Sequence, residues 1–261
     1  MVFFPIYSLL TLDAFVVRSI QPIPAGTQLT ISYISIFFSK STRAGDLKSA
    51  VHFLQHCECP RCTSADLFLS NVDAYLEGFD CPSDGCKGQI TQSDEETGAC
   101  RTCKTSFPWK SYSQFLLTFS QCLELLEEWP YATQIDVIST LKREAIERKM
   151  HRCHSFLVHL HCKEARIRGK HIALQTKRHP NTPMTEELNQ LTELSQLIFR
   201  ITNIISPKYH PVRTQYLLNL STVYKSLGNF DKAKTYETQA RTIATVCYGQ
   251  VNAHSLVKNY V

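Results

Sequence analysis

The segment 81–103 reads CPSDGCKGQITQSDEETGACRTC, and it decides how the middle of the chain folds. Two short cysteine pairs flank a polar, acidic stretch, and four thiolates so arranged form a complete tetrahedral site for Zn²⁺. Gly85 and Gly88 allow the chain to wrap tightly around a metal. A closed site leaves no open position for a substrate water, so the predicted role is structural. The predicted ligands are Cys81, Cys86, Cys100 and Cys103.

A second cluster precedes it, with the pattern Cys57-x-Cys59-x-x-Cys62. Three thiolates within six residues can bind one face of a tetrahedral Zn²⁺, which requires a fourth ligand. His52, His56 and a remote cysteine are the alternatives for that ligand. The spacing disfavours the other interpretation, three free buried thiols.

Composition narrows the class of protein. The chain has 261 residues, of which 43% are hydrophobic, and eleven cysteines. Tight cysteine pairs in a core-forming chain of this length indicate metal ligation in a reducing compartment, hence the cytoplasm and/or nucleus. The apolar stretch 1–12 is too short for a membrane span, so we expect buried strands there and no membrane contact. The net charge of +5 is mild and spread along the chain, so we expect no direct contact with nucleic acid.

Outward from the cysteines, the pattern is β-rich over 1–38, with a turn at Pro22–Gly26, and helix-like over 41–54. From Tyr112 onward, apolar residues recur at steps of three and four, which predicts helices. The predicted helices run from Tyr112 to before Pro130, from Gln134 to about Arg168 with Gly169 as the stop, from Thr185 to before Pro207, and over about 211–227 and 230–248.

The last two helices carry a repeat-like spacing. The pattern is Leu220-x3-Tyr224-x3-Gly228-x-Phe230-x2-Ala233-x6-Ala240, which is typical of a tetratricopeptide helix–turn–helix unit. The glycine allows a turn and the alanines allow close helix approach. A plain antiparallel helix pair is the alternative.

These motifs together resemble a known family. Ala14–Arg18, then Ile20-x-x-Ile23-x-Ala25-Gly26-x-x-Leu29-Thr30-Ile31-Ser32-Tyr33, then the CxCxxC cluster resemble the end of a SET domain and its post-SET zinc loop, as in the SET-and-MYND-domain family. The segments 210–213 and 254–256 resemble parts of that family's helical C-terminal domain. The extra four-cysteine site is most similar to the branch represented by SET and MYND domain-containing protein four.

The resemblance implies a protein lysine methyltransferase that uses S-adenosylmethionine. Tyr33 matches the family's catalytic tyrosine, whose hydroxyl aligns the lysine amine with the methyl group. Phe53 matches an aromatic position that packs against the cofactor, whereas Gln55 stands where the family commonly has a second aromatic. The family's post-SET zinc ligands match Cys57, Cys59 and Cys62.

Other family motifs do not occur in the 261 residues: a glycine-rich cofactor loop, a MYND zinc finger, and an Asn-His-x-Cys segment about thirty residues before the tyrosine. The resemblance therefore implies a sequence that begins inside a SET domain, as in a truncated isoform or incomplete gene model, and that is inactive as given.

The expected fold is α+β: part of a β-rich SET domain over 1–54, a cysteine-rich zinc segment over 55–110, and an all-α tetratricopeptide-like domain over 111–261. Zn²⁺ and S-adenosylmethionine are the implied cofactors, and a protein substrate or partner peptide is the implied partner. The alternative function is a zinc-stabilised helical-repeat adaptor for protein interaction.

Overall fold

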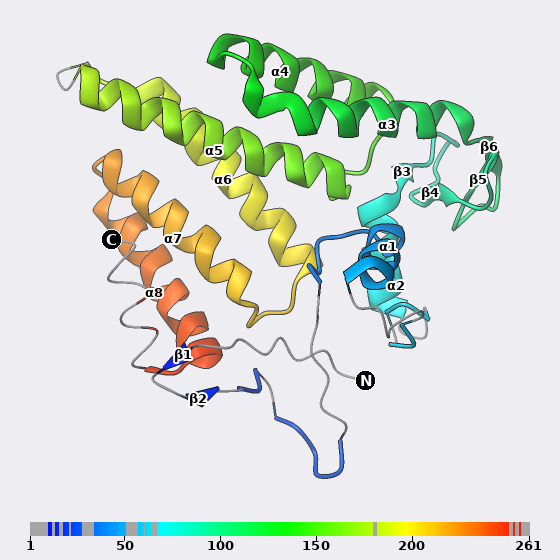
Figure 1. Ribbon diagram of the computed structural model, residues 1–261, viewed down its shortest axis with the longest axis horizontal. Coiled ribbons are helices and arrows are strands. Elements are labelled where there is room, and N and C mark those ends of the chain that lie inside the picture. Colours follow the sequence, from blue (N-terminus) through cyan, green and yellow to red (C-terminus); the bar gives the residue numbers. More distant parts are fainter. Residues whose placement is uncertain are drawn as a thin grey trace. The chain divides into compact units, whose positions relative to one another are not determined.

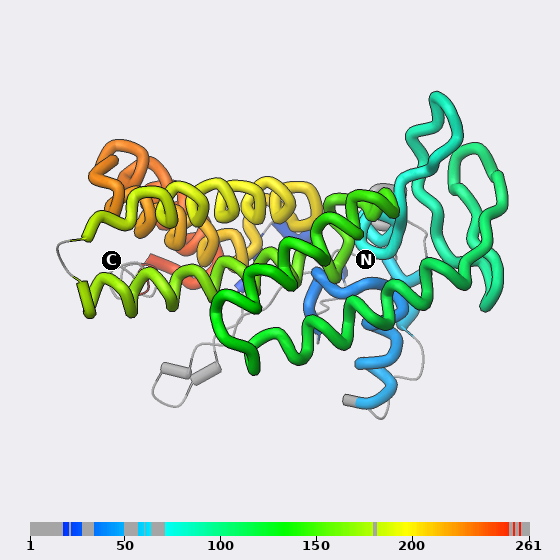
Figure 2. Tube along the Cα trace, turned by 90° about the horizontal axis from the view of Figure 1, so that it is seen from above, coloured from blue at the N-terminus to red at the C-terminus, as the bar shows by residue number. Residues whose placement is uncertain are grey.

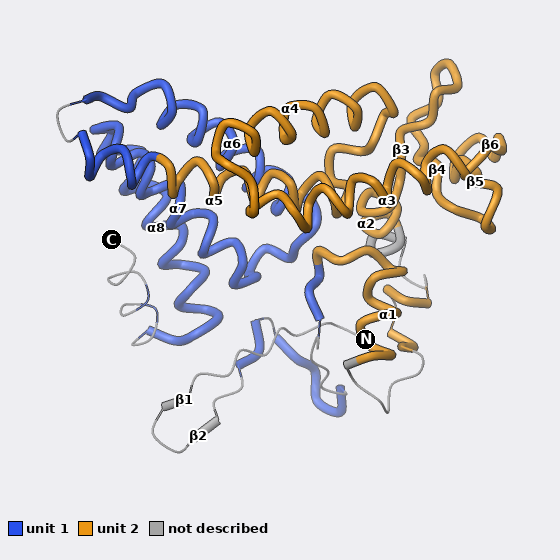
Figure 3. Tube along the Cα trace, turned by 45° about the horizontal axis from the view of Figure 1, so that its top comes forward, with its two compact units in different colours: residues 1–36, 172–261 blue, residues 37–171 orange. Residues whose placement is uncertain are grey.

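The structure is a computed structural model that describes residues 10–11, 14–15, 18–20, 22–27, 34–50, 57–59, 61–63, 67–179, 182–250, 253 and 256. The chain forms two compact units, residues 37–171 and residues 1–36 with 172–261 (Figure 3). Each unit is described by itself below.

The first part of the 37–171 unit contains both cysteine clusters. It begins with α1 (Lys40–Ala50) and α2 (Leu67–Glu77), and sequence reasoning anticipated only the first of these helices. A four-stranded antiparallel sheet follows, ordered as in the chain: β3 (Phe79–Asp80), β4 (Gln89–Gln92), β5 (Thr97–Cys100) and β6 (Ser106–Pro108) (Figure 1).

The rest of this unit is helical: α3 (Lys110–Leu125), a 3₁₀ turn η1 (Leu126–Glu128), α4 (Tyr131–Glu147) and α5 (Ser155–Arg178), of which residues 172–178 belong to the other unit. Their apolar faces share one core with the sheet, in which Phe79, Ile90 and Phe119 are fully buried. Burial of such side chains stabilises a fold by about 1.5–3 kcal/mol each. The sheet and the helices therefore fold as one body.

One predicted helix was wrong. The pattern over 134–168 forms two helices, α4 and α5, because the chain turns at Lys149, which has a positive φ of 56°. Met150 there forms an isolated bridge to Phe79, an interaction distant in sequence. Gly169 was predicted to end the helix, yet α5 continues to Arg178. A glycine inside a helix costs about 1 kcal/mol, which tertiary packing can offset.

The other unit is built on α6 (Thr185–Ile205), α7 (Pro211–Ser226) and α8 (Phe230–Tyr248), coloured yellow to red in Figure 2. It also contains a small hairpin of β1 (Leu10–Thr11) and β2 (Ala14–Phe15). The helices over 185–205, 211–226 and 230–248 match the predicted ranges. Helix α7 ends at Ser226, and Gly228, with a φ of 73°, reverses the chain just after it. The buried Ala233 and Ala240 allow α8 to pack closely on α7. The predicted α+β class is confirmed.

No helix within the described ranges is both long and apolar enough to cross a bilayer.

Candidate metal centres

The structure brings the sulfurs of the four-cysteine site together. The Sγ atoms of Cys81, Cys86, Cys100 and Cys103 all lie within 4.8 Å of one another. The Sγ–Sγ distance is 3.8 Å between Cys81 and Cys103 and 3.6 Å between Cys86 and Cys100. Zn–S bonds of about 2.3 Å at tetrahedral angles place sulfurs roughly 3.8 Å apart. The four cysteines therefore fit a tetrahedral metal ion.

Two tight turns build this site. Gly85 has a φ of 71° and lets the backbone N–H of Cys86 donate to Ser83. Lys104 has a φ of 64° and donates its backbone N–H to the carbonyl of Cys100 at 3.0 Å. One turn lies between Cys81 and Cys86 and the other follows Cys103, so the chain reverses beside both cysteine pairs.

Gly88 has a different role, because it lies against the cluster. A Cβ at this position would lie 2.6 Å from the Cys100 Sγ atom and 2.5 Å from the Thr102 hydroxyl oxygen. Only glycine fits beside the sulfurs without a backbone shift.

The electrostatics of the four thiols favour a cation. Hydrogen bonding to the Thr105 side chain lowers the pKa of Cys103 to about 6. For Cys86 the backbone N–H of Gly88 favours the thiolate, but loss of solvent and the neighbouring sulfurs outweigh it and raise the pKa to about 11. Thiols this close cannot all ionise without a positive charge between them, and a divalent metal supplies that charge.

The three-cysteine site is also assembled. The sulfurs of Cys57, Cys59 and Cys62 lie within 4.8 Å of one another, and Cys59 is buried. The carbonyl of Cys59 accepts hydrogen bonds from the backbone N–H groups of Cys62 and Thr63, which turns the chain around the cluster. His52 and His56, the nearby candidates for a fourth ligand, lie outside the described residues.

Sequence reasoning missed the charged residues around this site. Arg43 of α1 approaches the Cys62 Sγ atom to 3.8 Å and pairs with Asp73 of α2. Hydrogen bonding from Cys59 lowers the pKa of Cys62 to about 5, and Arg43 contributes to the same shift. A signal was available, since Arg61 lies inside the cysteine motif, where a buried cation requires an anion.

The other predicted residues separate into two groups. Tyr33 and Phe53, the predicted catalytic and cofactor residues, lie outside the described residues. Within the described part of the chain, the remaining cysteines join no cluster of metal ligands. Cys153 and Cys247 are instead buried thiols.

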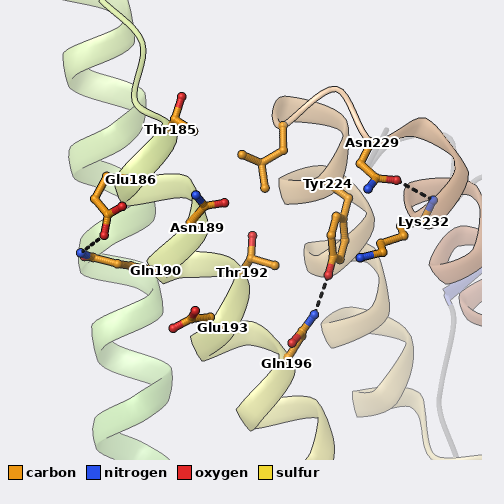
Figure 4. A pocket seen from close by; sticks show the side chains of 11 residues that line it. Thr185, Glu186, Asn189, Gln190, Thr192, Glu193, Gln196, Tyr224, Asn229 and Lys232 are labelled. Carbon is orange, nitrogen blue, oxygen red and sulfur yellow. Dashed lines mark hydrogen bonds between the residues drawn. The ribbon is translucent and has the colours of Figure 1, made fainter.

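A polar groove lies in the helical unit, between the start of α6 and the α7–α8 turn (Figure 4). It has a volume of about 660 Å³. The Gln196 amide donates to the Tyr224 hydroxyl at 2.5 Å, and Lys232 lies over the Tyr224 ring. The other groove residues are Thr185, Glu186, Asn189, Gln190, Thr192, Glu193, Leu227 and Asn229.

No protein-family model matches the chain. The chain is 37% identical over 90 residues to the histone-lysine N-methyltransferase ASHR1 of Arabidopsis thaliana, a match that covers 34% of this chain and 18% of that protein. It is 28% identical over 107 residues to the SET domain-containing protein SmydA-8 (isoform B) of Drosophila melanogaster, covering 40% of this chain and 22% of that one. A SET and MYND domain-containing protein of Dictyostelium discoideum is 34% identical over 76 residues, 27% of this chain and 18% of the relative.

The chain therefore spans about a fifth of the length of the curated relatives it matches. These relatives do not distinguish the branches of the family, so the similarity to the branch of SET and MYND domain-containing protein four stays a prediction. The resemblance at the level of the family is confirmed: the chain is a relative of the SET and MYND domain proteins.

Proposed function

We propose that this chain is part of an S-adenosylmethionine-dependent protein lysine N-methyltransferase that acts on a histone or non-histone protein. The observation that carries the proposal is the similarity to a histone-lysine N-methyltransferase and to SET domain proteins over segments of 76 to 107 residues. The assembled three-cysteine cluster supports it, because a post-SET zinc loop requires those thiolates together.

In this proposal Tyr33 is the catalytic residue. Its hydroxyl holds the lysine amine so that the nitrogen lone pair faces the methyl carbon of S-adenosylmethionine. When bound, S-adenosylmethionine would supply the methyl group: a bond from the amine nitrogen would replace the C–S bond, S-adenosylhomocysteine would leave, and the amine's surplus proton would pass to solvent. Such alignment can supply on the order of 7–11 kcal/mol of the barrier. Phe53 packs against the cofactor, which supplies the methyl group.

The metals have structural roles in this proposal. Cys57, Cys59 and Cys62 hold a zinc ion of the post-SET loop, and the four-cysteine site holds a second zinc ion that supports the β3–β6 sheet. The predicted boundaries at residues 54 and 110, with a tetratricopeptide-like region after the second, are proposed as divisions of function, since the sheet and α3–α5 share one core. A location in the cytoplasm and/or nucleus is proposed with them.

We expect the 261-residue polypeptide by itself to show no methyl transfer. Its sequence carries neither the glycine-rich loop nor the Asn-His-x-Cys segment, and Gln55 stands where the family has an aromatic. Titration of S-adenosylmethionine into the purified polypeptide by calorimetry tests this, since binding in the micromolar range would contradict it.

The proposed function itself requires the protein as its cells make it. The gene is tagged at its 3′ end in the source organism, and the purified product is incubated with radiolabelled S-adenosylmethionine and a panel of proteins. We expect label on lysine, and loss of the label in a Tyr33→Phe product that still contains both metals. No transfer by the intact product would overturn the proposal, and unchanged transfer by Tyr33→Phe would overturn the role of Tyr33.

A second candidate function is a helical-repeat adaptor, and the polar groove favours it. Its amide side chains, Asn189 and Gln196 among them, offer a donor and an acceptor each, which match the main chain of an extended peptide. Peptides selected by phage display should bind less tightly to Asn189→Ala and equally well to Gln239→Ala, an exposed position outside the groove. Equal binding to both variants would refute this use of the groove.

A further inference from the structure

Three charged side chains are buried beside the three-cysteine cluster. Arg43, Arg61 and Asp73 are 5%, 6% and 6% exposed. The Asp73 carboxylate accepts two hydrogen bonds from Arg43, at 2.6 and 2.9 Å, and two from Arg61, at 3.0 and 2.7 Å. The three residues come from α1, from the cysteine turn and from α2, so the network joins three segments.

This network has an excess of positive charge. Two guanidinium groups share one carboxylate, and a buried surplus charge costs several kcal/mol unless a counter-charge lies nearby. The neighbouring Glu77 is engaged elsewhere. Its carboxylate accepts the backbone N–H of Ser41 at 2.9 Å, and burial raises its pKa.

Two further acceptors lie beside the two arginines. Both guanidinium groups donate to the carbonyl of Phe38, at 2.9 and 3.5 Å, but a carbonyl carries no full charge. Arg43 also faces the Cys62 sulfur, which lies 3.8 Å from its Nη2 atom and carries a full negative charge as a thiolate. Three thiolates around a divalent cation carry a net negative charge. Its sign is opposite to that of the surplus charge on the two guanidinium groups and their shared carboxylate.

We propose that Arg43, oriented by Asp73, is a positioning residue of the three-cysteine metal centre, which donates to the Cys62 thiolate and offsets the charge of the metal–thiolate unit. The inference extends the proposed function, because it takes the three-cysteine cluster to be a metal site. Partners in the outer shell of a metal site typically contribute 10–100-fold to metal affinity.

The arrangement also couples the metal to the local fold. Asp73 fixes Arg43 with a bidentate pair, which lysine cannot reproduce. Because Arg43 lies on α1 and also holds the Phe38 carbonyl, metal binding stabilises the start of that helix.

The test compares Arg43→Met, which removes the charge, with Arg43→Lys, which keeps the charge but cannot form the bidentate pair with Asp73. Lys48→Met is the matched control, because Lys48 is an exposed cation on the same helix. The zinc-loaded 261-residue chain is challenged with a chelating dye, and zinc release is followed with time. Alkylation of Cys62 and Cys103, read by mass spectrometry, assigns each release phase to a site, and circular dichroism monitors folding.

We expect Arg43→Met to release zinc from the three-cysteine centre at least tenfold faster, Arg43→Lys to be intermediate, and Lys48→Met to match the wild type. The four-cysteine centre should be unaffected in all three. Unchanged release in both Arg43 variants, or equal acceleration at both centres, would overturn the role of Arg43. A wild-type chain that binds a single zinc ion would instead refute the three-cysteine centre itself. If Arg43→Met does not fold, Arg43→Lys alone decides between these outcomes.

Discussion

The two cysteine clusters bring their thiols together in different ways. The four-cysteine site is closed within 23 residues of chain by two tight turns and two hairpins, and its backbone is shaped to the metal. The three-cysteine site lies in one short turn and depends on charged residues from α1 and α2. The first site is thus built by local geometry and the second by tertiary electrostatics.

The difference predicts different consequences when a ligand is lost. Cys100 is fully buried in the main core of its unit, whereas Cys62 is only half-buried. We expect Cys100→Ser to lower the free energy of unfolding by several kcal/mol, because structural zinc contributes on the order of 10 kcal/mol to the folding of small zinc domains. Cys62→Ser should have a clearly smaller effect. Urea unfolding followed by circular dichroism measures both, and equal losses would contradict the comparison.

The order of metal release sharpens the same contrast. The four-cysteine site has a complete ligand set, and the three-cysteine site supplies three thiolates. A chelator titrated into the zinc-loaded chain should therefore remove the ion from the three-cysteine centre first, with at least a tenfold difference in the chelator concentration required. Protection of individual cysteines against alkylation assigns the order, and release from Cys103 before Cys62 would reverse the argument.

The sequence predicted the features that depend on residues close together in the chain. The cysteine spacing anticipated both clusters, and Pro211 and Gly228 set helix ends that the structure reproduces. It did not reveal the pair of Arg43 and Asp73, which are thirty residues apart. The break at Lys149 depends on packing of Met150 against a distant strand, and periodicity cannot report such a contact. Pairings between distant segments are set by the tertiary fold, so one sequence does not disclose them.

Acid should affect the core that supports the four-cysteine site. His154 packs against Phe79, two residues before Cys81, and burial lowers the pKa of His154 to about 3. Its folded pKa lies below the unfolded value of about 6.5, so its contribution to stability is complete above pH 6.5 and falls as the pH drops towards 3.

His154→Asn keeps a side-chain acceptor for the N–H of Phe156 and removes the titration. We expect this variant to lose a few kcal/mol less stability than the wild type between pH 6.5 and 4, measured by urea unfolding at each pH. Identical acid profiles would show that protonation of the cysteines, and not of the core, controls acid unfolding.

Gly88→Ala is a milder way to damage the four-cysteine site. The added Cβ would meet the Cys100 sulfur at 2.6 Å, and we expect a loss of about 1–3 kcal/mol, the usual cost of overpacking. The control is Gly169→Ala on α5, where the added Cβ meets nothing within 4 Å beyond its chain neighbours and its own helix backbone, and where alanine should stabilise the helix by about 1 kcal/mol. Thermal unfolding of both variants measures the contrast. A Gly88→Ala variant of unchanged stability would show that the neighbouring side chains shift to accommodate the added methyl group.

The smallest effect concerns strain in the turn of the four-cysteine site. Lys104 has a φ of 64°, a conformation that costs a residue with a side chain roughly 1–2 kcal/mol relative to glycine. Lys104→Gly removes this strain but increases the entropy of the unfolded chain, which offsets about 0.5–1 kcal/mol of the gain. A net stabilisation of about 0.5 kcal/mol is therefore expected.

Lys149→Gly, at a φ of 56° outside both metal sites, should gain the same amount with or without zinc. Because the backbone N–H of Lys104 bonds to the Cys100 carbonyl in the turn that faces the metal, the gain at this position should appear in the zinc-loaded chain and vanish once a chelator has removed the ion. Equal gains in both states would mean that the turn forms without the metal, and that the local backbone alone shapes the site.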